Sequence, residues 1–353
     1  MTVTGAGVAA RTLSPTSVRR ERFHRISRAA AVACVGSIAF AACGGSKAAP
    51  APLSPSSPPP ATSASPTAVA VLPAAGQIVA TIPVDNQADP LVFAFGSLWV
   101  GHYQASVVER IDPGRNKVVA RIPTDESPID FAIGFGSVWV ANYSSNTVSR
   151  IDPATNHAAT IQVGLQPEGI VAGDAGVWAI NLVEGTLSRI DPGTNKVTTT
   201  SDLGGRPFYG SIGFGTLWIA NQDGNRVQRV DEETGKVVGS VEVGAAPVHT
   251  AVGLGAVWVT CYDAGTLVRV DPQTNHVVAT IQVGQGVDGL LIHGGAVWVE
   301  SDRDHVLRQV DPATNTVVAS LDLGTEPRNL AFGAGSLWVA DFGGDQVLRI
   351  ALR

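Results

Sequence analysis

A tryptophan inside a short apolar run recurs along this sequence at an almost constant interval. Successive tryptophans are 40 residues apart, with one interval of 39, and the repeat uses all seven tryptophans of the chain: Trp99, Trp139, Trp178, Trp218, Trp258, Trp298 and Trp338. A period of about 40 residues that holds several short strand-like runs is typical of a β-propeller, in which each repeat folds into one blade. The period therefore predicts an all-β fold with seven blades.

Each repeat contains four strand-like runs separated by turn residues. The first run, such as Gly169–Ala172, follows a proline, and a turn such as Phe135-Gly136 leads to the run that contains the tryptophan. The third run ends in Arg-Ile-Asp-Pro, as at Arg150–Pro153, and the sequence Asp-Pro-x-Thr-Asn favours a type I turn before a fourth run such as Val277–Val283. The repeat thus predicts four-stranded antiparallel blades, with the tryptophans packed between neighbouring sheets rather than stacked on a ligand.

The two ends of the repeat region complement each other. The last repeat stops after its third run, Gln346–Ile350, whereas the region begins with an orphan fourth run at residues 77–84. If these two runs pair, the last blade is complete and no strand edge is left open to associate with another chain. We therefore predict a closed seven-bladed propeller over residues 76–353, and a monomer.

The residues before the propeller predict export. Residues 1–28 are rich in arginine, and Ala29–Ala42 is an apolar run of about 14 residues, too short to span a membrane but suited to a signal peptide. The sequence Phe40-Ala41-Ala42-Cys43 resembles a bacterial lipobox, in which the cysteine is lipidated and becomes the mature N-terminus. We therefore predict a lipoprotein-type signal peptide in residues 1–42, a lipid on Cys43 and an extracytoplasmic location at a bacterial membrane. Ordinary secretion is the alternative.

Residues 43–75 predict a spacer. Ser46–Ala75 consists mainly of proline, alanine and serine with almost no charge, a composition that stays extended and buries no core. Beyond residue 42 the chain carries 18 basic and 29 acidic residues and no basic run. Because such a surface repels phosphate backbones, the composition excludes a nucleic-acid partner.

The repeats resemble a known propeller family. The resemblance extends from Gln77 to Arg353 and is carried by Leu98–Val100, Val138–Asn142, Leu217–Asn221, the Arg-Ile-Asp-Pro sequences and Asn195-Lys196-Val197. These segments are similar to those of YVTN-repeat (YncE-like) propellers, which are related to NHL propellers. The resemblance implies an exported propeller that is often assigned to binding. Streptogramin lyases share the architecture, but their metal-dependent chemistry depends on a His and Glu cluster with a Glu-x-His pair, which this chain lacks.

Positions that differ between the repeats are the candidates for a functional site, since positions shared by every blade maintain the fold. One set is the two residues after the proline of the first run, and it supplies Asp130, Glu168, Tyr209, His249, Asp288 and Arg328. In the first repeat, Pro90 assigns Leu91 and Val92 to this set. The residue three after each tryptophan adds His102 and Asp341. We expect these loops to gather at one end of the central axis.

These residue types predict an acidic, partly aromatic binding face. Such a face suits a cationic ligand, a sugar, a peptide or a hard cation such as Ca²⁺ or Mg²⁺. We expect no cofactor and assign no catalytic residue, because the sequence shows no Ser-His-Asp motif, phosphate loop or zinc spacing. Cys261 has no His–carboxylate pair to activate it, and Asp302 and Asp304 are expected to be solvated loop acids.

Two functions follow from these observations. The first is a binding or scaffold module at the cell envelope, with a protein, peptide or glycan as its ligand and the membrane as a second partner through the lipid. The alternative is a metal-dependent lyase or hydrolase of streptogramin-lyase-like architecture that uses Asp130, Glu168, His249 and Asp288 around the axis. His249 is open to both interpretations, and also to that of an ordinary polar residue of the channel.

Overall fold

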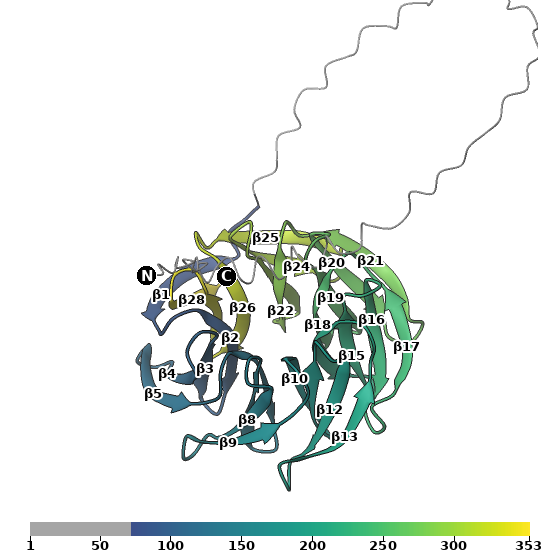
Figure 1. The fold of residues 1–353 in the computed structure, drawn as a ribbon. Coiled ribbons are helices and arrows are strands. Elements are labelled where there is room, and N and C mark those ends of the chain that lie inside the picture. The colour runs from purple at the N-terminus through teal and green to yellow at the C-terminus, as the bar shows by residue number, and fades with distance from the viewer. Residues whose placement is uncertain (1–71) are drawn as a thin grey trace, which may run out of the picture. The chain divides into compact units, whose positions relative to one another are not determined.

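The computed structural model describes residues 72–353, which form seven four-stranded antiparallel sheets around a central axis (Figure 1). These residues contain no helix, and hence none that could cross a membrane. The first strand of each blade contacts the first strands of the blades on either side, which closes the ring. The predicted seven-bladed propeller is therefore confirmed. The predicted signal peptide, Cys43 and most of the predicted spacer lie outside the described residues.

The strands follow the predicted order of four per repeat. Blade 1 holds β2 (Ala88–Ala94), β3 (Ser97–His102), β4 (Val107–Asp112) and β5 (Lys117–Pro123). Blade 2 holds β6 (Pro128–Gly134), β7 (Ser137–Asn142), β8 (Thr147–Asp152) and β9 (His157–Gln162). Blade 3 holds β10 (Pro167–Gly173), β11 (Gly176–Asn181), β12 (Thr186–Asp191) and β13 (Lys196–Asp202). Blade 4 holds β14 (Pro207–Gly213), β15 (Thr216–Asn221), β16 (Arg226–Asp231) and β17 (Val237–Glu242).

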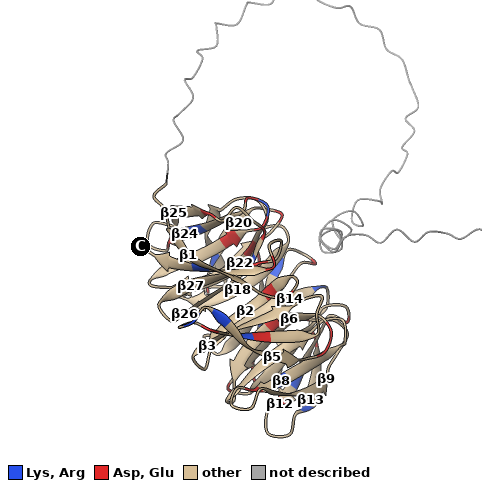
Figure 2. Ribbon diagram, turned by 90° about the vertical axis from the view of Figure 1, so that its left-hand side faces the viewer, with Lys and Arg blue, Asp and Glu red and all other residues tan. Residues whose placement is uncertain are grey.

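The remaining blades repeat this arrangement. Blade 5 holds β18 (Pro247–Gly253), β19 (Ala256–Cys261), β20 (Thr266–Asp271) and β21 (His276–Gln282). Blade 6 holds β22 (Val287–His293), β23 (Ala296–Ser301), β24 (Val306–Asp311) and β25 (Thr316–Asp322). Blade 7 holds β26 (Pro327–Gly333), β27 (Ser336–Asp341), β28 (Gln346–Leu352) and β1 (Gly76–Pro83). Figure 2 shows acidic and basic residues interspersed over the visible side of the ring.

The N-terminal strand completes the last blade, as predicted. β1 pairs antiparallel with β28, from Gly76 opposite Leu352 to Pro83 opposite Gln346. The segment just before β1 also contacts blade 6, because the backbone N–H of Ala75 donates to the carbonyl of Ser320 in β25. The observed strand covers residues 76–83, one residue earlier than the predicted range of 77–84.

The tryptophans are core residues, as the repeat pattern predicts. Every residue of the second strands β3, β7, β11, β15, β19, β23 and β27 is buried, and no tryptophan exceeds 2% exposure. Six of the seven tryptophans pack with apolar residues of the neighbouring blade; Trp178, for example, shares a cluster with Leu217 and Ile219 of β15. The indole N–H often donates to the carbonyl five residues earlier, as Trp139 does to Gly134 at 3.0 Å.

An arginine near the end of the third strand joins consecutive blades. The guanidinium of Arg269 lies 5.2 Å from the ring centroid of Trp258 in its own blade. Its Nη1 donates to the carbonyl of Pro312 at 2.7 Å and to Oδ1 of Asn315 at 3.1 Å, both in the third-to-fourth turn of blade 6. Arg349 of the last blade makes the same contacts to the corresponding turn of blade 1. The arginine and the turn between the third and fourth strands therefore recur together because the arginine of one blade binds the turn of the next.

Blade 6 is the exception, and the topology explains it. Gln309 stands where the other six blades have arginine. In blade 7 the third strand β28 and the fourth strand β1 come from opposite ends of the fold and are not joined by a turn. An arginine at position 309 would therefore find no turn carbonyl or asparagine to bind.

This difference gives a matched pair of variants. Replacing Arg269 by methionine removes charge-assisted hydrogen bonds and a cation–π contact, so we expect the free energy of unfolding to fall by about 1–3 kcal/mol. Gln309→Met removes no inter-blade bond of this kind and is expected to change it by less than about 0.5 kcal/mol. Urea unfolding monitored by tryptophan fluorescence measures both. Equal losses in the two variants would contradict the inter-blade role of the arginine.

The single 39-residue interval also has a structural cause. In six blades, including blade 7 with its β28–β1 pair, the pairing of third and fourth strands shifts register at a bulge, as between Arg110 and Ile111 in blade 1. In blade 2, β8 pairs with β9 without a shift, so that Arg150 faces Ala159 and Ile151 faces Ala158. The missing residue between Trp139 and Trp178 is thus the extra residue of a β-bulge.

Candidate functional site

The variable positions at the start of the first strands form two rings of residues. The residues ten before each tryptophan are all buried: Asp89, Ile129, Glu168, Phe208, Val248, Asp288 and Arg328. The residues that follow them are Pro90, Asp130, Gly169, Tyr209, His249, Gly289 and Asn329. The first strands surround the axis (Figure 1). Because these residues lie at the starts of those strands, both rings lie around one end of the axis.

The prediction for the first repeat was wrong. Ala88, not Pro90, lies opposite His102 in the position that proline occupies in most other blades. Asp89 and Pro90 therefore belong to the two rings, and Leu91 and Val92 lie further along β2. Counting back ten residues from Trp99 would have found Asp89, which is 2% exposed.

His249 and Asp288 form a close pair between blades 5 and 6. Nδ1 of His249 lies 3.1 Å from Oδ1 of Asp288, and the histidine side chain keeps 15% of its surface exposed. Tyr209 of blade 4 stacks on the imidazole, with ring centroids 3.9 Å apart and an interplanar angle of 9°. Three of the predicted site residues, from β14, β18 and β22, are therefore in contact.

Arg328 extends this pair into blade 7. Its Nη1 lies 3.6 Å from Oδ2 of Asp288 and 3.0 Å from Oδ2 of Asp302. The hydroxyl of Tyr262 donates to Oδ2 of Asp302 at 2.8 Å. Asp302 is buried and ion-paired, so its prediction as a solvated loop acid was wrong. The result is a continuous series of contacts from His249 through Asp288, Arg328 and Asp302 to Tyr262.

Glu300 is a further acid of this cluster that the sequence analysis missed. It is fully buried, and its Oε1 accepts the backbone N–H of Gly289 at 2.6 Å. Burial raises its pKa well above the ordinary value, and the nearby carboxylates of Asp288 and Asp302 raise it further. Burial also raises the pKa of Asp302, against the opposing effect of Arg328. Three acids, Asp288, Glu300 and Asp302, thus share this cluster with the single guanidinium of Arg328.

Asp130 and Glu168 bring blades 2 and 3 to the same end of the axis. Burial raises the pKa of Asp130 to about 7; the backbone N–H groups of Ile170 and Phe131 and the charge of His249 oppose this rise, and the charge of Glu168 adds to it. Both of those N–H groups donate to Asp130 at 2.8 Å. Asp130 is thus within electrostatic reach of both Glu168 and His249. Of the four residues that the enzyme hypothesis needs, His249 and Asp288 are in contact, and Asp130 interacts electrostatically with Glu168 and His249.

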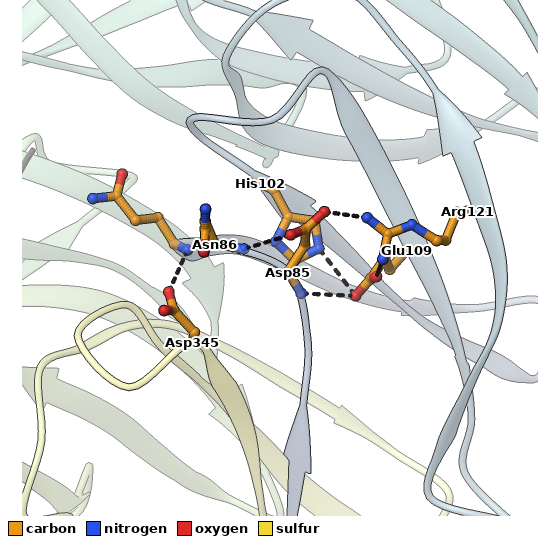
Figure 3. A network of polar contacts seen from close by, with 7 residues as sticks. Asp85, Asn86, His102, Glu109, Arg121 and Asp345 are labelled. Atoms are coloured by element: carbon orange, nitrogen blue, oxygen red, sulfur yellow. Dashed lines mark hydrogen bonds and ion pairs between the residues drawn. The ribbon is translucent and has the colours of Figure 1, made fainter.

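His102 and Asp341 contact residues of their own blades and of the adjoining segments, rather than the other six predicted site residues. Nε2 of His102 lies 3.3 Å from Oε2 of Glu109, whose other oxygen is 2.8 Å from Nη1 of Arg121 (Figure 3). The N–H of Asp85 also donates to Glu109, so this network holds the segment between β1 and β2.

This position joins the second strand to the third strand in most blades. Asn142, for example, donates to Oγ of Ser149 at 2.9 Å, and Asp341 accepts from Nε2 of Gln346 at 2.6 Å. The residue pair changes from blade to blade because the two side chains must match each other. His102 and Asp341 therefore stabilise their own blades.

Two further features bear on the chemistry of the described residues. They contain no group of three or more His, Cys, Asp or Glu side chains that could hold a metal ion. Cys261 is buried in β19, and burial raises the pKa of its thiol to about 11, which keeps it protonated and unreactive.

Comparison with known proteins identifies the fold. No protein-family model and no curated protein matches this sequence. Among solved structures, a streptogramin B lyase is similar, with a TM-score of 0.70, 17% identity and coverage of 78% of this chain and 97% of the lyase. A virginiamycin B lyase from Staphylococcus aureus is similar with a TM-score of 0.70 and 16% identity, over 78% of this chain and 99% of the lyase. The Kuenenia stuttgartiensis hydrazine synthase is similar with a TM-score of 0.65 and 14% identity, over 76% of this chain and 97% of the synthase chain. At these identities the likeness shows a shared propeller fold, and membership of the YVTN-repeat family stays a prediction.

Proposed function

We propose that this protein is an exported, lipid-anchored propeller that binds a positively charged ligand, such as a lysine-bearing peptide, at one end of its axis. The observation that carries the proposal is the convergence of acidic side chains from neighbouring blades beside the stacked Tyr209–His249 pair. The location rests on the sequence of residues 1–43. A rigid frame with variable residues at the axis is suited to selective binding.

The charges at this end favour a cation. Arg328 already contacts two carboxylates, those of Asp288 and Asp302. Burial is the main cause of the raised pKa of Asp130, and repulsion by the charge of Glu168 adds to it. A ligand ammonium group between them would relieve this repulsion, and the protein surroundings would strengthen the attraction relative to water. Tyr209 is 3% exposed and stacks on the imidazole, so it holds His249 in place beside the acids.

A trilysine peptide with an acetylated N-terminus is a suitable probe for isothermal titration calorimetry. We expect Glu168→Gln to weaken its binding roughly tenfold, equivalent to about 1.4 kcal/mol. Asp174→Asn removes an exposed acid from the turn at the other end of blade 3 and is expected to leave the affinity unchanged. The affinity should rise from pH 6 to pH 8, because Asp130 loses its proton near pH 7 while the lysines stay charged. If the peptide does not bind at pH 8, the cation-binding proposal is wrong.

A lyase or hydrolase is the second candidate. It is favoured by the His249–Asp288 pair, in which the carboxylate can orient the imidazole as a general base, and by the propeller fold shared with the two lyases. Turnover of virginiamycin B, with and without Mg²⁺, tests this candidate directly. Activity that is lost in His249→Gln would place the enzyme function above the binding function.

A further inference from the structure

Four turns at the other end of the first strands expose large apolar side chains. Each turn joins a first strand to a second strand, and its leading residue is 38–51% exposed: Phe95, Phe135, Phe214 and Leu254. We refer to these four residues as the apolar turns. They lie in blades 1, 2, 4 and 5, whereas the same position holds Asp174, Gly294 and Ala334 in blades 3, 6 and 7.

The backbone of the apolar turns disfavours the residues found there. Their φ angles are 51°, 52°, 55° and 54°, in the left-handed region, and each is followed by a glycine that also has a positive φ. Two-residue hairpin turns of this kind favour Asn-Gly, because asparagine tolerates a positive φ far better than phenylalanine or leucine. These side chains therefore cost stability through both backbone strain and solvent exposure, which points to a role outside the fold.

The apolar turns form two neighbouring pairs around the axis. Phe95 and Phe135 belong to adjacent blades, as do Phe214 and Leu254, and the first strands that lead to them are in contact. The inner ends of the blades are close together here: a Cβ built on Gly213 would lie 2.3 Å from Cγ1 of Val252. The four side chains are thus presented together on one face of the ring.

The chain enters the propeller at this same face. Gly76 at the start of β1 lies opposite Leu352, and the neighbouring Ile350 lies opposite Leu337, beside the turn at 334–335. The 32 residues between Cys43 and Gly76 form the predicted spacer. Extended at about 3.1 Å per residue, as its proline content predicts, this segment would span about 100 Å, so a lipid on Cys43 would keep this face within reach of the membrane.

We propose that the apolar turns dock this face of the propeller onto the lipid surface to which the chain is tethered. The inference rests on the lipid attachment in the proposed function. A fluid bilayer suits the apolar turns because it can accept two separate pairs of apolar side chains without a surface of matching shape. A protein partner would instead have to fit the acidic and small residues between the pairs. Tethering raises the effective concentration of the membrane, so a few shallow apolar insertions give lasting contact.

Docking in this way has a direct consequence for the axial site. The rings that contain Asp130 and His249 lie at the opposite ends of the first strands from the apolar turns. The membrane-bound propeller therefore presents its acidic end away from the lipid, toward soluble ligands.

Hydroxyl-radical footprinting on tethered protein tests the contact. The chain from Cys43 onward is coupled through the Cys43 thiol to a maleimide lipid in phosphatidylcholine vesicles; the buried Cys261 thiol does not compete. We expect side-chain oxidation of the apolar turns to be at least fivefold slower than in the same chain coupled to a water-soluble maleimide. Val119 and Val238 are exposed on the outer strands β5 and β17 and should be oxidised equally in both samples. Equal oxidation of the apolar turns would overturn the proposal.

An asparagine variant separates docking from folding. In the untethered Cys43→Ser chain, we expect the partition coefficient into the same vesicles to fall at least tenfold when all four apolar turns are replaced by asparagine. The melting temperature should stay equal or rise, because Asn-Gly suits the turn. Val119→Thr with Val238→Thr is the control and should partition like the parent chain.

Two other results would contradict docking on lipid. One is unchanged partitioning of the asparagine variant. The other is a dimer that the parent chain forms in analytical ultracentrifugation and the asparagine variant does not. That result would make a second copy of the chain the partner. Neither measurement depends on lipidation in the cell or on ligand binding, so failure of the docking proposal is distinguishable from failure of the proposed function.

Discussion

Replacing Ile82 by alanine is expected to lower the free energy of unfolding by about 2–5 kcal/mol. Ile82 is only 3% exposed and belongs to the cluster that joins β1 to Leu98 and Val347. Its loss leaves a cavity in the one blade whose strands come from the two ends of the propeller. Chemical denaturation at equilibrium measures the effect.

Val79 provides the control on the same strand. It is 53% exposed, so Val79→Ala is expected to change the free energy of unfolding by less than about 0.5 kcal/mol. Similar losses in the two variants would mean that the apolar contacts of β1 do not stabilise the ring.

Deleting β1 altogether should have a still larger effect. A chain that begins at residue 84 would expose the edge of β28 along its whole length, and open edges pair with other chains. We expect this chain to form oligomers in size-exclusion chromatography and to lose its single unfolding transition. A monomer with one sharp transition would show that the other six blades hold the ring without the closing strand.

The fold could be predicted from the sequence because the tryptophan interval, the turn sequences and the two ends of the repeat region all indicated the same architecture. The tryptophan interval gave the blade number, and the turn sequences gave four strands per blade. The orphan run at residues 77–84 gave the closure. Even the departures from the repeat have local causes: Gln309 faces a blade that lacks the turn, and the 39-residue interval lacks a bulge.

The site could be predicted only in part, because contacts across blades depend on register and side-chain direction. Pro90 misled the alignment of the first repeat, since proline also occurs two residues further along a first strand. Glu300 did leave a signal, because the other repeats carry small or uncharged residues two positions after the tryptophan. An ionisable residue at a position that is otherwise buried and uncharged indicates a site even before the fold is known.

Arg328 is the residue whose loss should most disturb the axial site. Its side chain is 5% exposed, contacts Asp288 and Asp302, and lies over the ring of Phe342 at 5.0 Å from the centroid. Methionine is similar in length but uncharged, so Arg328→Met leaves two buried carboxylates without their guanidinium. Removing one partner of a buried ion pair costs about 3–5 kcal/mol, and we expect a loss of this size at pH 8. Arg303→Met, at an exposed residue stacked on Tyr262, is expected to cost less than about 1 kcal/mol.

The loss of stability in Arg328→Met should depend on pH, whereas a loss caused by a packing defect would not. The pKa of Asp302 is already raised in the folded protein, and losing Arg328 removes the main opposing charge. An acid whose folded pKa exceeds its unfolded value keeps its proton longer in the folded state. Its contribution to stability is therefore lost as the pH rises through the folded pKa. The deficit of Arg328→Met should thus be smaller at pH 5 than at pH 8, and adding Asp302→Asn should recover part of it. An equal deficit at both pH values, with no recovery, would show that Arg328 acts through packing rather than through charge.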